Sequence, residues 1–129
     1  MLSAVKGDVV IRAFDKTPSL IIDCGNCADP HRLFPYIREE QLHSVYVVNA
    51  EAIYRFRDAL IESQKWIHKL RLKQLIVTPI YTLFSYDDET ENYNVIEHCW
   101  ELMKKMKIPV TIGVKENDEF ASRFADIYI

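Results

Sequence analysis

The segment 23–31 contains the residues whose types and spacing are most suited to chemistry, a Cys-x-x-Cys pair at Cys24 and Cys27 followed by His31. Such a pair placed before a helix suits thiol redox work, because a helix N-terminus lowers the pKa of a nearby thiol. The same three residues are also of the types that bind zinc, with a fourth ligand from elsewhere in the chain. The third interpretation is a buried turn of small residues, which is favoured because zinc sites usually contain a second tight pair and this chain has none.

A second set of polar residues follows the expected strands. Ligands of open α/β sheets gather at the carboxyl ends of the strands. The polar residues at these ends are Asp23, Asn26, Asn49, Thr78 and Glu116. Among them, Asp23, Asn26 and Asn49, together with an acid from the run 87–91, are candidates for the carboxylate cluster of a metal-dependent nuclease or phosphohydrolase, because two-metal chemistry requires several converging carboxylates. Only Asp23 is an acid placed firmly at a strand end, so the pattern does not identify a metal.

The chain lacks a motif for binding nucleotide phosphates. Backbone amides approach a phosphate closely only where side chains are missing, which requires a glycine-rich turn, usually with a lysine. Gly7, Gly25 and Gly113 are the three glycines, each isolated, and no Gly-Lys-Ser or Gly-Lys-Thr occurs. The sequence therefore argues against a standard P-loop enzyme.

Two charged groups have a functional and a structural interpretation. An acidic run could hold a divalent cation or could be a solvated loop; it consists of Asp87, Asp88, Glu89 and Glu91. A basic group lies around the expected end of a helix, and it consists of Lys65, His68, Lys69, Arg71 and Lys73. It could contact phosphate, including that of DNA, but the favoured interpretation is that it satisfies the carbonyl groups at the helix C-terminus.

Apolar runs and their spacing predict the elements that position these residues. Short apolar runs bounded by turn residues predict strands at 8–13, 20–23, 45–48, 75–77, 110–114 and 126–129. Apolar positions three and four residues apart predict long helices at 50–70 and 92–107, and turn signals predict short helices at 30–37 and 118–124. Since strands and helices alternate, we expect an α/β fold with a mainly parallel sheet of five to six strands and helices on both faces, in a RecA-like or Rossmann-like three-layer arrangement.

Composition supports one globular domain over residues 1–129. Sixteen basic and 19 acidic residues leave a formal net charge of -3, which argues against a polycation that coats nucleic acid or anionic lipid. The 49% of hydrophobic residues suffice for a core, and apolar runs stay below the roughly 18 residues of a membrane helix. With three cysteines and no signal-peptide pattern, we expect a cytoplasmic protein with free thiols and no membrane partner.

Several segments in series resemble the ATPase core of the RecA, RadA and KaiC superfamily. The matching segments are 19–23, 31–33, 45–50, 75–84, 108–112 and 122–129, so the resemblance covers residues 19–129. The order of these segments carries most of the resemblance. It implies a single RecA-like α/β domain with a possible link to DNA repair or recombination.

The chain departs from that family at the residues that carry out the family's chemistry. The Walker A motif and its helix are missing, Gly25 stands where the family has a catalytic glutamate, and Thr78 replaces the Walker B aspartate. Without a phosphate cradle, a metal anchor or a base, little stabilisation of the transition state of ATP hydrolysis remains. The resemblance therefore implies a non-catalytic binding or regulatory module with no cofactor, which acts on a protein partner or self-associates.

Overall fold

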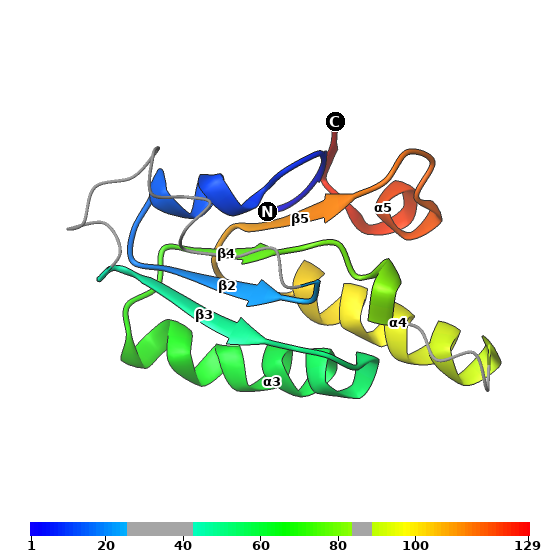
Figure 1. Ribbon diagram of the computed structural model, residues 1–129, viewed down its shortest axis with the longest axis horizontal. Coiled ribbons are helices and arrows are strands. Elements are labelled where there is room, and N and C mark those ends of the chain that lie inside the picture. Colours follow the sequence, from blue (N-terminus) through cyan, green and yellow to red (C-terminus); the bar gives the residue numbers. More distant parts are fainter. Residues whose placement is uncertain (26–42, 84–88) are drawn as a thin grey trace.

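A computed structural model describes residues 1–25, 43–83 and 89–129, and in these residues it shows one six-stranded, all-parallel sheet (Figure 1). The strands are β1 (Leu2–Lys6), β2 (Ser19–Asp23), β3 (Val45–Asn49), β4 (Gln74–Val77), β5 (Val110–Val114) and β6 (Ile127–Tyr128). Their order across the sheet is β3-β2-β4-β5-β1-β6. The helices are α3 (Ile53–Lys69), α4 (Glu89–Lys104) and α5 (Glu119–Phe124), with short 3-10 helices η1 (Val10–Phe14) and η3 (Tyr81–Leu83). The predicted three-layer α/β fold is confirmed.

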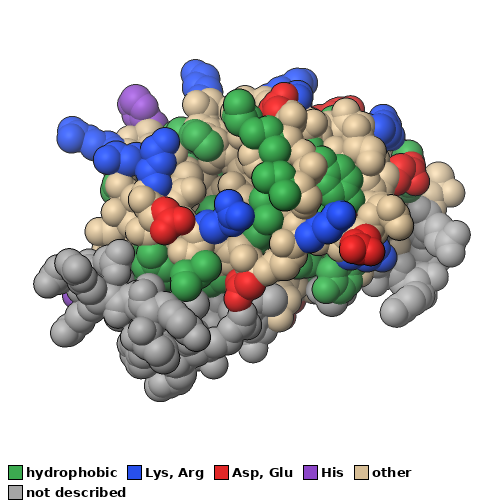
Figure 2. All heavy atoms as spheres, turned by 90° about the horizontal axis from the view of Figure 1, so that it is seen from above, with side chains coloured by type: hydrophobic (Ala, Val, Ile, Leu, Met, Phe, Trp, Pro, Cys, Tyr) green, Lys and Arg blue, Asp and Glu red, His purple; other side chains and the backbone are tan. Residues whose placement is uncertain are grey.

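Two hydrophobic clusters lie on opposite faces of the sheet. Because side chains alternate along a strand, Leu20 and Ile22 of β2 pack in the cluster formed with α3, α4 and α5, while Ile21 packs in the cluster formed with η1. The central strands are therefore covered on both faces, which explains their unbroken apolar sequences. Figure 2 shows the side of the molecule above η1 and the chain ends, where apolar side chains are visible among charged ones. Ile11 of η1 and Ile129 keep 39% and 67% of their surface exposed.

The first strand is not where the sequence analysis places it. Residues 2–6 form β1, and the predicted strand at 8–13 is largely the 3-10 helix η1. The Asp8 carboxylate accepts the Val10 N–H at 3.0 Å, and Gly7 has a positive φ of 96°, so the chain turns sharply after β1. Short apolar runs do not distinguish a strand from a helical turn by periodicity alone, which is the reason for the error.

The other predicted elements in the described residues lie close to their observed positions. The two long helices, predicted at 50–70 and 92–107, are α3 and α4. The predicted helix at 30–37, and Asp87 and Asp88 of the acidic run, lie outside the described residues. Among the helices that the structure describes, none has both the length and the apolar surface that crossing a bilayer requires.

Asp126 joins the first strand to the last part of the chain. Its carboxylate accepts the N–H of Leu2 at 2.8 Å, and its own N–H donates to the Leu2 carbonyl at 2.8 Å. Its carboxylate also forms an ion pair with Lys104 at the end of α4. The hydrogen bond from Leu2, and secondly the bond from Lys104, lower the pKa of Asp126 below its ordinary value of 3.8.

We therefore expect Asp126→Asn to lower stability at neutral pH. A carboxyl whose pKa is lower in the folded state stabilises the fold above its unfolded pKa, and this contribution is lost as the pH falls through the folded pKa. The difference in urea midpoint between wild type and variant should thus be largest near neutral pH and shrink in strongly acidic buffer. Glu62→Gln, on the exposed face of α3, is the control. A pH-independent difference for Asp126→Asn would contradict the assigned role of the charge.

Candidate ligand site at the carboxyl ends of the strands

The predicted strand-end residues are partly brought together. Asp23 and Asn49 are register partners at the ends of β2 and β3, and both line a cavity of about 260 Å³. Thr78 is buried directly after β4, the other neighbour of β2. Glu116 is exposed in the loop after β5, away from these residues. Asn26 lies outside the described residues.

Hydrogen bonds show that Asp23 and Thr78 hold the end of the sheet together. The Asp23 carboxylate accepts the N–H of Gly25 at 3.2 Å and the hydroxyl of Thr78 at 3.3 Å. The Thr78 hydroxyl in turn accepts the N–H of Cys24 at 2.6 Å. Asp23 is only 3% exposed, so the bonds satisfy a carboxylate that would be costly to bury without partners. These contacts fix the turn that follows β2 to the end of β4.

The described residues give no support to the thiol or metal sites. Cys24 is buried and its N–H donates to Thr78, whereas Cys27 and His31 lie outside the described residues. Cys99, on α4, is buried, and this burial raises its pKa to about 12, so it stays a protonated thiol at neutral pH. Within residues 1–25, 43–83 and 89–129, no group of three or more His, Cys, Asp or Glu side chains is placed to hold a metal ion. The predicted nuclease or phosphohydrolase thus gains no support.

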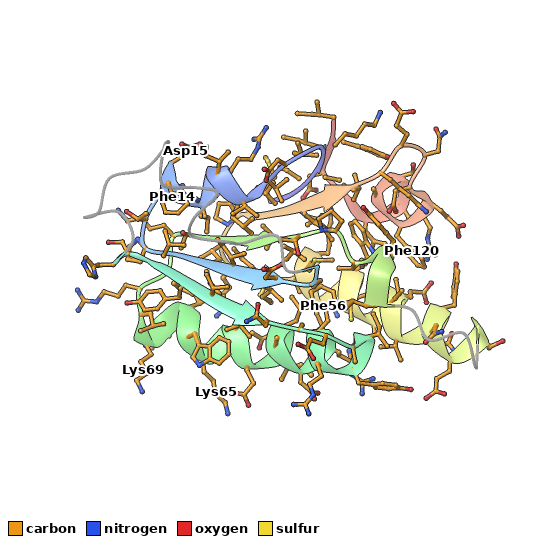
Figure 3. The ribbon with its side chains drawn as sticks, in the orientation of Figure 1. Phe14, Asp15, Phe56, Lys65, Lys69 and Phe120 are labelled. Atoms are coloured by element: carbon orange, nitrogen blue, oxygen red, sulfur yellow. The ribbon has the colours of Figure 1, made fainter. Side chains whose placement is uncertain are left out.

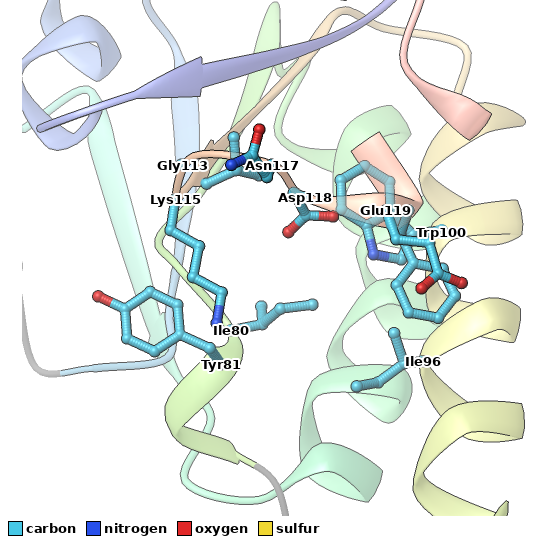
Figure 4. A pocket seen from close by; sticks show the side chains of 11 residues that line it. Ile80, Tyr81, Ile96, Trp100, Gly113, Lys115, Asn117, Asp118 and Glu119 are labelled. Atoms are coloured by element: carbon cyan, nitrogen blue, oxygen red, sulfur yellow. The ribbon is translucent and has the colours of Figure 1, made fainter. Parts of the chain in front are cut away.

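A second cavity lies at the same edge of the sheet, beyond β4 and β5. Its volume is about 250 Å³, and Figure 4 shows its lining side chains. The residues lining it are Ile80, Tyr81, Ile96, Trp100, Gly113, Val114, Lys115, Asn117, Asp118, Glu119 and Phe120. They come from the ends of β4 and β5, the inner face of α4 and the start of α5. The cavity therefore lies where ligands of parallel α/β sheets bind.

The inner wall of this cavity is apolar and aromatic. Trp100 is 1% exposed, and its ring stacks on Phe120 with the centroids 6.4 Å apart and the planes inclined by 11°. Ile80 and Ile96 are also buried and complete the apolar wall. A rigid apolar wall of this kind suits the face of a flat ring, which it removes from water.

Polar side chains lie on the loop between β5 and α5. Lys115 extends along one side of the cavity with its ammonium nitrogen 5.6 Å from the centre of the Tyr81 ring, and the Asp118 carboxylate points toward the space between Tyr81 and Trp100 (Figure 4). Asp118 caps α5 by accepting the N–H of Ala121 at 2.9 Å. The cavity thus combines an apolar wall with one cation, Lys115, and two carboxylates, Asp118 and Glu119.

The conformation of this loop is fixed by its neighbours. Asn117 has a φ of 59°, a left-handed conformation that asparagine tolerates better than most residues. The Tyr128 hydroxyl accepts the N–H of Asp118 at 2.8 Å and donates to the Lys115 carbonyl at 3.3 Å. The final strand β6 therefore supports the loop that carries the polar groups of the cavity.

Gly113, which lines the same cavity, leaves room for the neighbouring Pro79. A Cβ added at Gly113 would lie 3.0 Å from the Cδ atom of Pro79 and 3.3 Å from a methyl group of Val9. Pro79 ends the hydrogen-bond ladder of β4 because proline has no N–H to donate. Its ring packs over β5 because position 113 has no side chain. A larger residue at position 113 would push apart the ends of β4 and β5.

The polar residues after the strands predict the correct edge of the sheet but not the residues of this second cavity. Glu116 is the residue predicted at the end of β5, whereas the flanking Lys115 and Asn117 line the cavity. The feature of the sequence that could have indicated this cavity is Lys115 directly after a predicted strand, followed by Asp118 as a helix cap. Trp100 had no separate signal, because an aromatic residue in an apolar helical stripe is ordinarily part of the core.

Comparisons with known proteins concern the fold alone. No family model and no curated protein sequence matches the chain. The chain resembles the solved structure of the macrodomain of Thermus aquaticus DarG, with a TM-score of 0.54 and 12% identity, over 89% of this chain and 99% of that one.

The resemblance to the RecA, RadA and KaiC ATPases is wrong, because a macrodomain is a different α/β fold. Short apolar strands that end in polar residues and alternate with helices recur in any parallel α/β protein, so their order does not separate one family from another. The interpretation as a degenerate ATPase fails with that resemblance. The described residues of this chain thus form an α/β fold similar to that of a macrodomain.

Proposed function

We propose that this chain is a binding module for a small ligand with a flat, amine-bearing heteroaromatic ring and a negatively charged group, such as an adenine nucleotide. The observation that carries the proposal is the cavity beyond β4 and β5, where an aromatic wall, a carboxylate and a lysine face one space. The ring would lie against the wall formed by Trp100 and Phe120. Its amino group would donate to Asp118, and Lys115 would attract the negative charge.

The size of the cavity limits what it can enclose. Its volume of about 250 Å³ is just below the range of roughly 300–1,000 Å³ found for pockets that bury drug-sized ligands. We therefore expect it to enclose one ring system, with any sugar or phosphate groups at the rim near Lys115. The likeness of the fold to that of a macrodomain supports a binding module, for which ADP-ribose is a natural probe.

Calorimetric titration with adenosine, purine riboside, ADP and ADP-ribose tests the proposal. Adenosine should bind more tightly than purine riboside, because purine riboside lacks the amine and has no N–H at that edge of its ring to donate to Asp118. ADP and ADP-ribose should bind more tightly than adenosine, because Lys115 attracts their phosphates. Lys115→Ala should weaken ADP binding by at least roughly tenfold, because a hydrogen bond to a charged group contributes about 1.5–3 kcal/mol.

Lys65→Ala, an exposed lysine on α3 outside this cavity, is the matched control and should leave ADP affinity unchanged. Equal affinity of all four ligands, or an equal effect of both lysine substitutions, would contradict the proposed site. The proposal concerns binding alone, and it does not include DNA repair or recombination, which depended on the ATPase resemblance. The cytoplasmic location and the single domain over residues 1–129 stay predictions from the sequence.

A further inference from the structure

A third cavity lies at the opposite edge of the sheet, between the C-terminal ends of α3 and α4. Its volume is about 400 Å³, and it is lined by Gln64, Ile67, His68, Lys105, Met106 and Lys107. Residues 70–73 lead from α3 into β4, and residues 105–109 lead from α4 into β5, so this cavity is near the start of those strands. It is therefore separate from the proposed ligand site at the carboxyl ends.

The surroundings of this cavity, which we call the basic groove, are strongly cationic. His68, Lys105 and Lys107 line it and are exposed. Lys65 and Lys69 extend away from α3, and Lys69 is at the end of α3 from which the chain enters β4 (Figure 3). Each helix C-terminus contributes only about half a negative charge, which the lysines exceed. Of the basic residues singled out in the sequence, His68 lines the groove, and Lys65 and Lys69 lie on the same helix.

The floor of the basic groove is apolar and aliphatic. Met106 is 8% exposed, and Ile67 is half-buried against the main core. Methionine adapts its shape to different contacts, which suits a floor that receives a side chain from a partner. Gln64 adds an exposed amide at the wall, able to bond a peptide group.

We infer that the basic groove binds an acidic polypeptide segment that inserts one apolar side chain between flanking Asp or Glu residues. The cationic rim complements the acidic residues, and the aliphatic floor receives the apolar side chain. Among the described residues that line it, there is no aromatic ring on which a base could stack and no arginine for bidentate binding of phosphate. These features favour a peptide over a nucleic acid as the occupant.

Fluorescence anisotropy with labelled heptapeptides tests this inference on the full chain. The probe has a central leucine with three acidic residues on each side, and its control has glycine in place of leucine. The leucine peptide should bind more tightly than the glycine peptide, and its affinity should fall as the salt concentration rises. Absence of binding at low salt, or equal binding of the two peptides, would overturn the inference.

Charge-reversal variants locate the binding surface. Lys105→Glu combined with Lys107→Glu should weaken binding of the leucine peptide by at least roughly tenfold, since two attractive pairs become repulsive. Lys6→Glu combined with Arg55→Glu makes the same change in net charge with exposed residues outside the basic groove, so it is the matched control. Equal losses of peptide affinity in the two double variants would show a nonspecific charge effect and contradict binding in the basic groove.

A single-stranded oligonucleotide is the competing probe. If it binds more tightly than the leucine peptide and loses affinity in the Lys105→Glu/Lys107→Glu variant, the surface binds nucleic acid and the peptide inference is wrong. Weaker oligonucleotide binding supports the peptide. Neither Lys105 nor Lys107 lines the cavity beyond β4 and β5, so the result of these peptide and oligonucleotide experiments is independent of the proposed ligand site.

Discussion

Replacing Trp100 with alanine is expected to lower the free energy of unfolding by about 3–5 kcal/mol. Its ring is 1% exposed and packs between α4 and α5, with its centroid 6.4 Å from those of both Phe120 and Phe124. The substitution leaves a cavity between α4 and α5, and the surrounding structure relaxes only partly to fill it. Chemical denaturation followed by circular dichroism measures the loss.

Two further variants separate packing from other effects of the Trp100 substitution. Trp100→Phe keeps an aromatic ring and should lose clearly less stability than Trp100→Ala. Glu101→Ala, at the exposed neighbouring position on α4, should change stability by less than about 0.5 kcal/mol. A loss below about 1 kcal/mol for Trp100→Ala would contradict the packing described for α4 and α5.

The second large effect is expected at the end of β2, where Asp23→Ala should lower the free energy of unfolding by about 1–3 kcal/mol. The substitution removes the acceptor of the Thr78 hydroxyl and of the Gly25 N–H. Because Thr78 is fully buried, water does not readily replace the lost bond. Urea denaturation of the variant, with and without magnesium or manganese, measures the effect.

A double-mutant cycle identifies the source of this loss. If Asp23 acts by accepting the Thr78 hydroxyl, Asp23→Ala combined with Thr78→Val should cost less than the sum of the two single substitutions. The structural role of Asp23 also implies that divalent cations leave the wild-type midpoint unchanged. A metal-dependent gain in stability that disappears in Asp23→Ala would instead support the metal-dependent enzyme.

The sequence was sufficient to predict the elements that have a long or uninterrupted pattern. The helix α3 shows apolar residues at helical spacing over several turns, and β2 and β5 are short apolar runs between turn residues. The strand β1 was missed because Ser3 and Ala4 weaken its apolar pattern, while Val9, Val10 and Ile11 form a stronger run nearby. The structure shows that η1 uses that run to cover the second face of the sheet.

The candidate sites depend on contacts between distant segments, which limited their prediction. Asp23 and Thr78 were found because both follow predicted strands and the ends of parallel strands meet at one edge. The second cavity instead requires α4 to pack beside α5, so that Trp100 faces Phe120. No local pattern around Lys115 or Asp118 contains that information.

The position of β1 between β5 and β6 has a consequence for synthesis of the chain. Leu2 pairs in register with Val110, and Ser3 pairs with Ile127. The ribosome therefore makes β1 well before either of its neighbours. Such long-range pairing slows folding and leaves an early strand exposed to wrong partners. During translation, Leu2–Lys6 accordingly remains without its native partner strands until residues 110–128 have been made.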